Sequence, residues 1–112
     1  MLRSAADFAA LRRDSRGRGD ELVAVRVRVS DQEAPRVGFA TGRKLGGAVV
    51  RNRVRRRLRS IVRSLGPRLA PRRDILIVVR PSGAIADQAR LAASIERALQ
   101  ALGALQGEAT NR

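Results

Sequence analysis

The chain has 112 residues and a formal net charge of +14, from 24 basic and 10 acidic side chains. This length suits one domain with a single core, and the positive charge favours a polyanionic partner such as nucleic acid. The chain contains no cysteine and no histidine, which excludes disulfides, thiolate metal sites and the commonest general base. No apolar run approaches the roughly 20 residues that span a bilayer, and charges interrupt the region where a signal peptide needs its apolar core. We therefore expect a cytoplasmic protein that does not associate with membranes.

Two segments precede the first expected strand. Ser4 and Asp7 form a capping pattern that predicts a helix ending near Arg13. Phe8 lies on one face of this helix, where core packing is its simplest role. Residues 14–20 are rich in glycine and in charged side chains, which predicts a loop.

Three segments have the patterns of β-strands. Residues 22–29 alternate between valine and other side chains, which predicts a half-buried strand. One face, toward the core, carries Val23, Val25, Val27 and Val29, and the other carries Leu22, Ala24, Arg26 and Arg28. Residues 37–41 predict a second strand that pairs with the first as a hairpin. Residues 74–79 form a continuous apolar run, which is typical of a strand covered on both faces. A turn over residues 80–83 is expected to end this third strand.

The sequence is organised around a strongly basic helix that begins after Gly46 and Gly47 and ends at Leu65. Its large apolar side chains recur at helical spacing and form one stripe, made of Val50, Val54, Leu58, Ile61, Val62 and Leu65. The opposite face carries arginines, and no acidic residue occurs between Glu33 and Asp74. A surface helix normally mixes both signs of charge, because opposite neighbours stabilise it and like neighbours destabilise it. The uniform sign therefore favours a face that binds a polyanion over a merely solvated one.

A final helix is expected from about Asp87 to Leu102, and residues 103–112 are expected to fray. The elements then follow the order α-β-β-α-β-α, with or without one extra short strand. This order predicts an α+β fold, a two-layer α-β sandwich. We expect residues 1–112 to form a single domain that binds a polyanion, with an ordered core of about residues 4–102. The acidic residues are scattered over caps, loops and helix surfaces, so the sequence predicts no catalytic residue and no metal site.

The segment from Val37 to Arg59 resembles the signature of the protein subunit of bacterial ribonuclease P. In that family a Val-Gly-hydrophobic strand leads to a basic pair, then to Gly-Asn-Ala-Val, Arg-Asn-Arg and a basic helix. The triplet at residues 51–53 matches the central motif of the family, whereas Gly47 stands where the family has asparagine. With weaker similarity in the opening helix and the late strand, the resemblance covers most of residues 4–102.

The resemblance implies both a fold and a function. The β-α-β unit around the basic helix would have a left-handed crossover, although about 98% of such crossovers are right-handed. The protein would be a component of ribonuclease P, an endoribonuclease ribonucleoprotein that matures the 5′ ends of tRNA and whose catalysis resides in its RNA. The implied partners are that RNA subunit and precursor tRNA, with no stable protein partner. The protein alone would bind no cofactor, and Mg²⁺ would act in the RNA-containing holoenzyme.

Two groups of site residues follow from the resemblance. Contact with the RNA subunit, or with its junction with substrate, is implied for Arg43, Lys44, Arg51, Asn52, Arg53, Arg55, Arg56 and Arg59. A cleft that binds the 5′ leader of precursor tRNA is implied for Phe8, Arg12, Ala24 and Arg26. Arg12 and Arg26 occupy positions that are often aromatic in the family. Leader binding here is therefore expected to rely more on guanidinium–phosphate contacts than on stacking.

The residue patterns also leave two other functions open. A non-catalytic structural RNA-binding protein, of ribosomal or RNA-assembly type, would have the same charge and helix pattern. Only the signature from Arg43 to Arg59 separates it from the ribonuclease P subunit. Binding to a membrane surface through the basic helix is disfavoured, because the chain has no tryptophan and few bulky apolar residues to anchor it.

Overall fold

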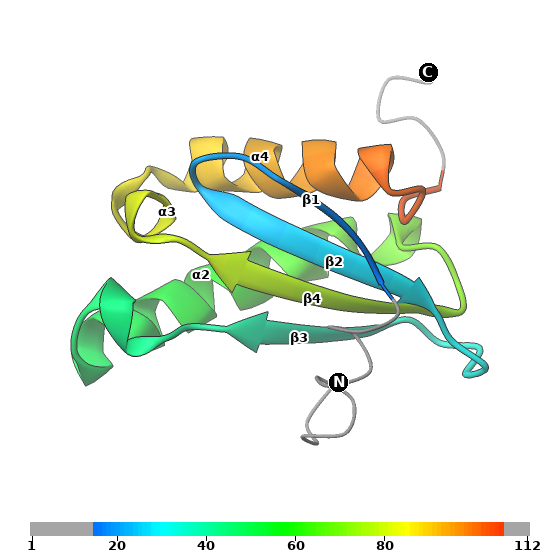
Figure 1. The fold of residues 1–112 in the computed structure, drawn as a ribbon, viewed down its shortest axis with the longest axis horizontal. Helices are drawn as coiled ribbons and strands as arrows, with labels where there is room; N and C mark the ends of the chain where they lie inside the picture. The colour runs from blue at the N-terminus through cyan, green and yellow to red at the C-terminus, as the bar shows by residue number, and fades with distance from the viewer. Residues whose placement is uncertain (1–14, 107–112) are drawn as a thin grey trace.

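The computed structural model describes residues 15–106, in which a four-stranded sheet packs against a layer of helices (Figure 1). The elements are β1 (Arg16–Gly19), β2 (Val23–Val29), β3 (Arg36–Ala40), the 3-10 turn η1 (Arg43–Leu45), α2 (Ala48–Leu65), the 3-10 turn η2 (Gly66–Arg68), β4 (Arg73–Val79), α3 (Pro81–Ile85) and α4 (Gln88–Ala101). The predicted α+β class is thus confirmed. The expected first helix, with Phe8 and Arg12, lies outside the described residues.

The strands are ordered β1-β2-β4-β3 across the sheet. β2 runs antiparallel to both of its neighbours, and β3 runs parallel to β4. The predicted hairpin between residues 22–29 and 37–41 is therefore wrong, because β4 lies between these two strands. The apolar run of β4 makes this possible, since a central strand is covered on both faces. The extra short strand is β1, which forms where the glycine-rich sequence predicted a loop.

β3, α2 and β4 form a parallel β-α-β unit. In Figure 1 the arrows of β3 and β4 point to the left, β4 lies above β3, and α2 passes behind the sheet. When both strands are turned to point upward, the chain steps to the right with its helix behind the sheet. This is the left-handed sense that the family resemblance implied, against the general preference for right-handed crossovers.

One face of the sheet carries the core. The side chains that fill it come from β2, β4, α2 and α4, and include Val23, Val25, Val27, Ile75, Ile77, Val54, Leu58, Ile61, Leu91, Ile95 and Leu99. Two positions differ from the prediction. Val29 is 72% exposed, because it pairs with Arg73 at the last position of the ladder, where arginines surround it. Leu22 is buried, because β2 begins only at Val23 and the preceding residue turns inward.

The second face of the sheet has an apolar part and a charged end. Across β2, β4 and β3, the rows that share this face are Ala24–Val78–Ala40, Arg26–Leu76–Gly38 and Arg28–Asp74–Arg36. Among residues 15–106 all helices lie on the opposite face (Figure 1). The described part of the fold therefore leaves an open sheet face that grades from small apolar side chains to arginines.

Asp20 ties the turn between β1 and β2 to α4. Its carboxylate accepts hydrogen bonds from the backbone N–H groups of Leu22 and Val23, at 2.8 and 3.1 Å, and from the Ser94 hydroxyl. Burial alone would raise the pKa of Asp20. The three hydrogen bonds and the nearby charge of Arg97 outweigh burial, so the pKa lies below its ordinary value. A charged carboxylate thus closes this corner at neutral pH.

The C-terminal third adds a short helix and a longer packed end than expected. Residues 80–83 were predicted to form a turn, but α3 begins at Pro81 and is tightly packed. A Cβ added at Gly83 would lie 2.3 Å from the Leu22 carbonyl oxygen, so only glycine fits there. After α4, Ala104 is fully buried and Leu105 bridges to Leu69, although fraying was expected from residue 103. No helix in the described part of the chain is long and apolar enough to cross a membrane.

Candidate RNA-binding surface

A tight corner joins β3 to the basic helix and presents Arg43 and Lys44. Both residues lie in η1 and are exposed. Gly46 has a φ of 130°, a conformation that favours glycine, and it allows the chain to reverse into α2. Gly47 is the N-cap of α2, yet no side chain caps the helix and its first turn contains no acidic residue. A glycine N-cap leaves the N–H groups of the first turn of α2 without a side-chain acceptor.

The arginines of α2 form a continuous basic face. The helix buries its apolar stripe through Val54, Leu58, Ile61 and Leu65, which fixes the rotation of the helix about its axis. Asn52, Arg53, Arg56 and Arg59 are exposed as a result, and Arg51 and Arg55 are partly buried. The structure therefore places all the residues predicted to contact the RNA subunit on one helix and the corner that leads into it.

A shallow hollow of about 510 Å³ lies on this face, between side chains that follow one another along the helix. It is lined by Val49, Asn52, Arg55, Arg56 and Arg59. Within it Arg55 donates a hydrogen bond of 3.3 Å to the Asn52 side-chain oxygen, so Asn52 orients a guanidinium. Several guanidiniums around an open hollow can contact neighbouring phosphates of one RNA strand.

The basic face has no counter-charge within the described residues. The ion pairs of residues 15–106 involve Arg28, Arg36, Arg68, Arg72 and Arg97, and none of these lies on α2. The residues of this range also contain no group of three or more acidic side chains that could hold a metal ion. The face is therefore suited to electrostatic binding of a polyanion, with phosphate as the matching ligand group.

Arg57 belongs to the same arginine run but has a different role, which the sequence did not reveal. Its guanidinium donates to the Gln88 side-chain oxygen at 3.0 Å, and to the carbonyl oxygens of Ala84 and Ala86 at 3.4 and 2.5 Å. These acceptors lie at the end of α3 and the start of α4. Arg57 therefore links α2 to α3 and α4 through hydrogen bonds, and its guanidinium is directed away from the RNA-binding face.

Replacing Arg57 should lower stability, whereas replacing its neighbour Arg56 should weaken RNA binding. Arg57→Ala removes three hydrogen bonds to a charged donor, so we expect the free energy of unfolding to fall by about 2 kcal/mol. The salt dependence of RNA binding by the Arg57→Ala variant should stay unchanged. Arg56→Ala, at an exposed position, should leave stability within about 0.5 kcal/mol and reduce the salt slope by roughly one unit. Urea unfolding and RNA titrations at several salt concentrations measure both. A shallower slope for Arg57→Ala would place its guanidinium on RNA.

The described residues of the predicted leader cleft, Ala24 and Arg26, lie on the other side of the sheet. Ala24 and Arg26 point from β2 into the open face, and both are partly buried. The Arg26 guanidinium lies across Gly17 of β1 and donates to the Ser15 hydroxyl at 3.0 Å. Phe8 and Arg12, the other members of the predicted cleft, lie outside the described residues. The structure therefore places Ala24 and Arg26 on the face of the sheet opposite the helix that carries the predicted RNA-subunit contacts.

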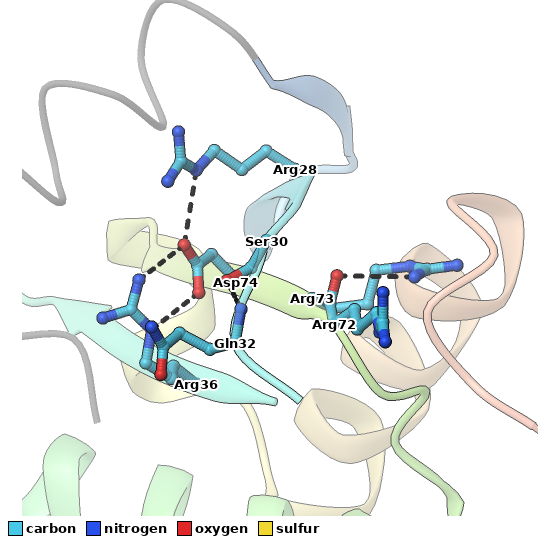
Figure 2. Close-up of polar contacts among 7 residues, drawn as sticks. All are labelled: Arg28, Ser30, Gln32, Arg36, Arg72, Arg73 and Asp74. Atoms are coloured by element: carbon cyan, nitrogen blue, oxygen red, sulfur yellow. Dashed lines mark hydrogen bonds and ion pairs between the residues drawn. The ribbon is translucent and has the colours of Figure 1, made fainter. Parts of the chain in front are cut away.

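A buried carboxylate organises the charged end of the open face, as Figure 2 shows. Asp74 on β4 is 1% exposed and accepts two hydrogen bonds of 2.8 Å from Arg36 on β3, and one of 3.3 Å from Arg28 on β2. Each arginine side chain remains about a quarter exposed, at 26% and 27%. One carboxylate thus fixes two guanidiniums next to the predicted leader cleft. This cluster could not be predicted from the sequence, because its residues come from three separate strands.

Within residues 15–106, this α+β sandwich combines an arginine helix that forms no ion pair with an open, partly basic sheet face, and these features are typical of small RNA-binding proteins. Residues 1–103 match the Ribonuclease P family. The chain belongs to this family, and it does so on a match that covers nearly its whole length.

Individual relatives agree with this assignment. The ribonuclease P protein component of Roseiflexus castenholzii is 39% identical over 108 residues, covering 95% of this chain and 88% of the relative. That of Acidothermus cellulolyticus is 41% identical over 100 residues, covering 88% and 83%. Among solved structures, a mutant RNase P protein of Staphylococcus aureus superimposes with a TM-score of 0.85 at 20% identity, covering 92% of this chain and 87% of that one. The structural match supports the fold.

Proposed function

We propose that this chain is the protein subunit of a ribonuclease P ribonucleoprotein, in which it binds the catalytic RNA through α2 and the 5′ leader of precursor tRNA through the open sheet face. The observation that carries this proposal is the exposed arginine face of α2, which lacks any acidic partner in residues 15–106, within a chain of this family. The alternative of a ribosomal or assembly protein is not favoured, since the relatives are ribonuclease P protein components.

In this proposal the protein supplies binding and charge, and the RNA supplies the chemistry. Arg51, Arg53 and Arg56 would neutralise phosphates of the RNA subunit, while Arg43 and Lys44 extend the contact toward the substrate junction. Ala24 and Arg26 would line the path of the leader, with the side chain of Arg26 directed at phosphate. We propose that Mg²⁺, held by the RNA, carries out phosphodiester hydrolysis, that the protein binds no cofactor of its own, and that the complex works in the cytoplasm.

Reconstitution tests the proposal. The protein is combined with a bacterial ribonuclease P RNA at low magnesium, and cleavage is assayed on a precursor tRNA whose leader has several nucleotides. We expect faster cleavage and tighter precursor binding than with the RNA alone, because the protein lowers the repulsion between two polyanions. A leaderless tRNA serves as the control and should gain little affinity. Equal results with and without the protein would contradict the assignment.

A further inference from the structure

A second basic hollow lies at the end of β2, away from the arginine face of α2. It has a volume of about 420 Å³ and is lined by Arg16, Val27, Arg28, Val29, Arg73, Leu102 and Gly103. Ligand sites for small molecules fall in a range of about 300–1,000 Å³. The arginines come from three different strands, β1, β2 and β4, so the sheet itself brings them together.

Each of these arginines is held by one edge of its guanidinium. Arg16 donates from Nη2 to the Leu102 carbonyl oxygen at 3.0 Å, and Arg73 donates from Nη1 to the Pro71 carbonyl oxygen at 2.9 Å. These acceptors are neutral, and within residues 15–106 neither arginine forms an ion pair. A guanidinium has five N–H donors, so most of the donors of Arg16 and Arg73 remain available. Their positions are fixed while their charges are not neutralised.

The third arginine is already paired. Arg28 donates to Asp74, and Asp74 also accepts from Arg36, so this carboxylate is shared and turned toward the open face. The hollow thus keeps the positive charges of Arg16 and Arg73 next to an arginine that links it to the open sheet face.

Apolar side chains line one side of the hollow, next to the arginines. Val29 is 72% exposed although it belongs to a strand whose other valines are almost fully buried. It lines the hollow beside Val27 and Leu102, which are 5% and 6% exposed. A nucleotide presents a matching combination, since it has an anionic phosphate next to an apolar ribose and base surface.

We infer that this hollow binds one nucleotide of a single-stranded RNA, with its phosphate between Arg16 and Arg73 and its ribose or base against Val29. The inference rests on the proposed function for its source of RNA. Ala24, Arg26 and Arg28 alternate along β2 on the open face, at about 7 Å for each step of two residues. Val29 and its ladder partner Arg73 lie on the opposite face by the same alternation, so a strand that follows the open face reaches the hollow by passing around the end of β2 beyond Arg28. The nucleotide therefore comes from the leader or from the RNA subunit, and the test separates these sources.

The test uses reconstituted holoenzyme with two kinds of variant. Arg16→Gln combined with Arg73→Gln removes the charges, and Val29→Asp keeps both arginines but opposes phosphate. Because the Val29 side chain is exposed, Val29→Asp should fold even if the double arginine variant is destabilised. The matched controls are Arg80→Gln combined with Arg90→Gln, at two exposed arginines before α3 and on α4, and Ile85→Asp, at an apolar residue of α3 that is 86% exposed. Affinity is measured for the RNA subunit alone and for precursors with leaders of increasing length.

We expect either test variant to weaken binding about tenfold, as for loss of a charge-assisted contact, and the controls to change it less than twofold. A loss of affinity only for precursors with longer leaders assigns the nucleotide to the leader. A loss of affinity for the RNA subunit alone assigns it to that RNA. The inference would be overturned if the test variants bound both the RNA subunit and the precursors with wild-type affinity, or if the controls lost as much affinity as the test variants. If the wild-type protein itself gave no gain over RNA alone, the proposed function would fail instead.

Discussion

Replacing Arg51, Arg53 and Arg56 together with alanine should weaken binding to the ribonuclease P RNA by about 100- to 1,000-fold. Each guanidinium–phosphate contact contributes about 1–1.5 kcal/mol, and 1.4 kcal/mol corresponds to a factor of ten in affinity. The slope of log K against log salt should become shallower by up to about three units, since each lost phosphate contact removes roughly one released counterion. Filter binding at several salt concentrations measures both quantities. The buried stripe of α2 is untouched, so the helix should remain folded.

The matched control removes the same charge elsewhere. Arg80, Arg90 and Arg97 are exposed and lie on α4 or before α3, so their triple alanine variant lowers the net charge equally without altering α2. We expect it to lose only a small part of the affinity, through the weaker long-range field of the protein. If both triple variants lost the same affinity and slope, binding would depend on net charge, and the α2 face would have no specific role.

The basic face could be predicted from the sequence because it is a local property of one helix. The spacing of Val54, Leu58 and Leu65 fixes which side of α2 is buried, and the arginines then occupy the remaining arc. The same helical geometry places Arg56 within the basic face and Arg57 at its border, but it cannot show which groups Arg57 contacts. Their roles differ because Ala84, Ala86 and Gln88 approach only one of them, and this depends on how α3 and α4 pack.

The sheet shows the same division between local and long-range information. Residues 23–29, 36–40 and 73–79 have strand patterns that can be recognised one at a time. The order of the strands in the sheet cannot be recognised in this way. Proximity in the sequence favoured a hairpin between residues 23–29 and 36–40, whereas in the structure β4 lies between them. The left-handed crossover came from the family resemblance alone. β1 has the sequence Arg-Gly-Arg-Gly, with no apolar pattern, and it is recognisable as a strand only through its pairing with β2.

Asp74 is the largest consequence of this long-range pairing. A lone aspartate at the start of an apolar strand gives no signal in the sequence, yet β4 brings it between an arginine of β2 and an arginine of β3. Asp74→Asn should lower the free energy of unfolding by about 3 kcal/mol. The amide has nearly the same shape but no charge, and removing one partner of a buried ion pair costs about 3–5 kcal/mol. We expect the lower end of this range, because Arg28 and Arg36 are partly exposed and retain some hydration.

Urea unfolding followed by circular dichroism measures this change, with Glu33→Gln as the control. Glu33 pairs with Arg72 at 3.2 Å, but both side chains are mostly exposed, so the same loss of charge should cost less than about 1 kcal/mol. Asp74→Asn should also reduce the affinity for long-leader precursors at temperatures where the variant is folded, because Arg28 and Arg36 lose the negative charge and one of the two acceptor oxygens that orient them on the open face. A variant as stable as the control would show that the two arginines are held by packing, and that the buried carboxylate contributes little to the charged end of the sheet.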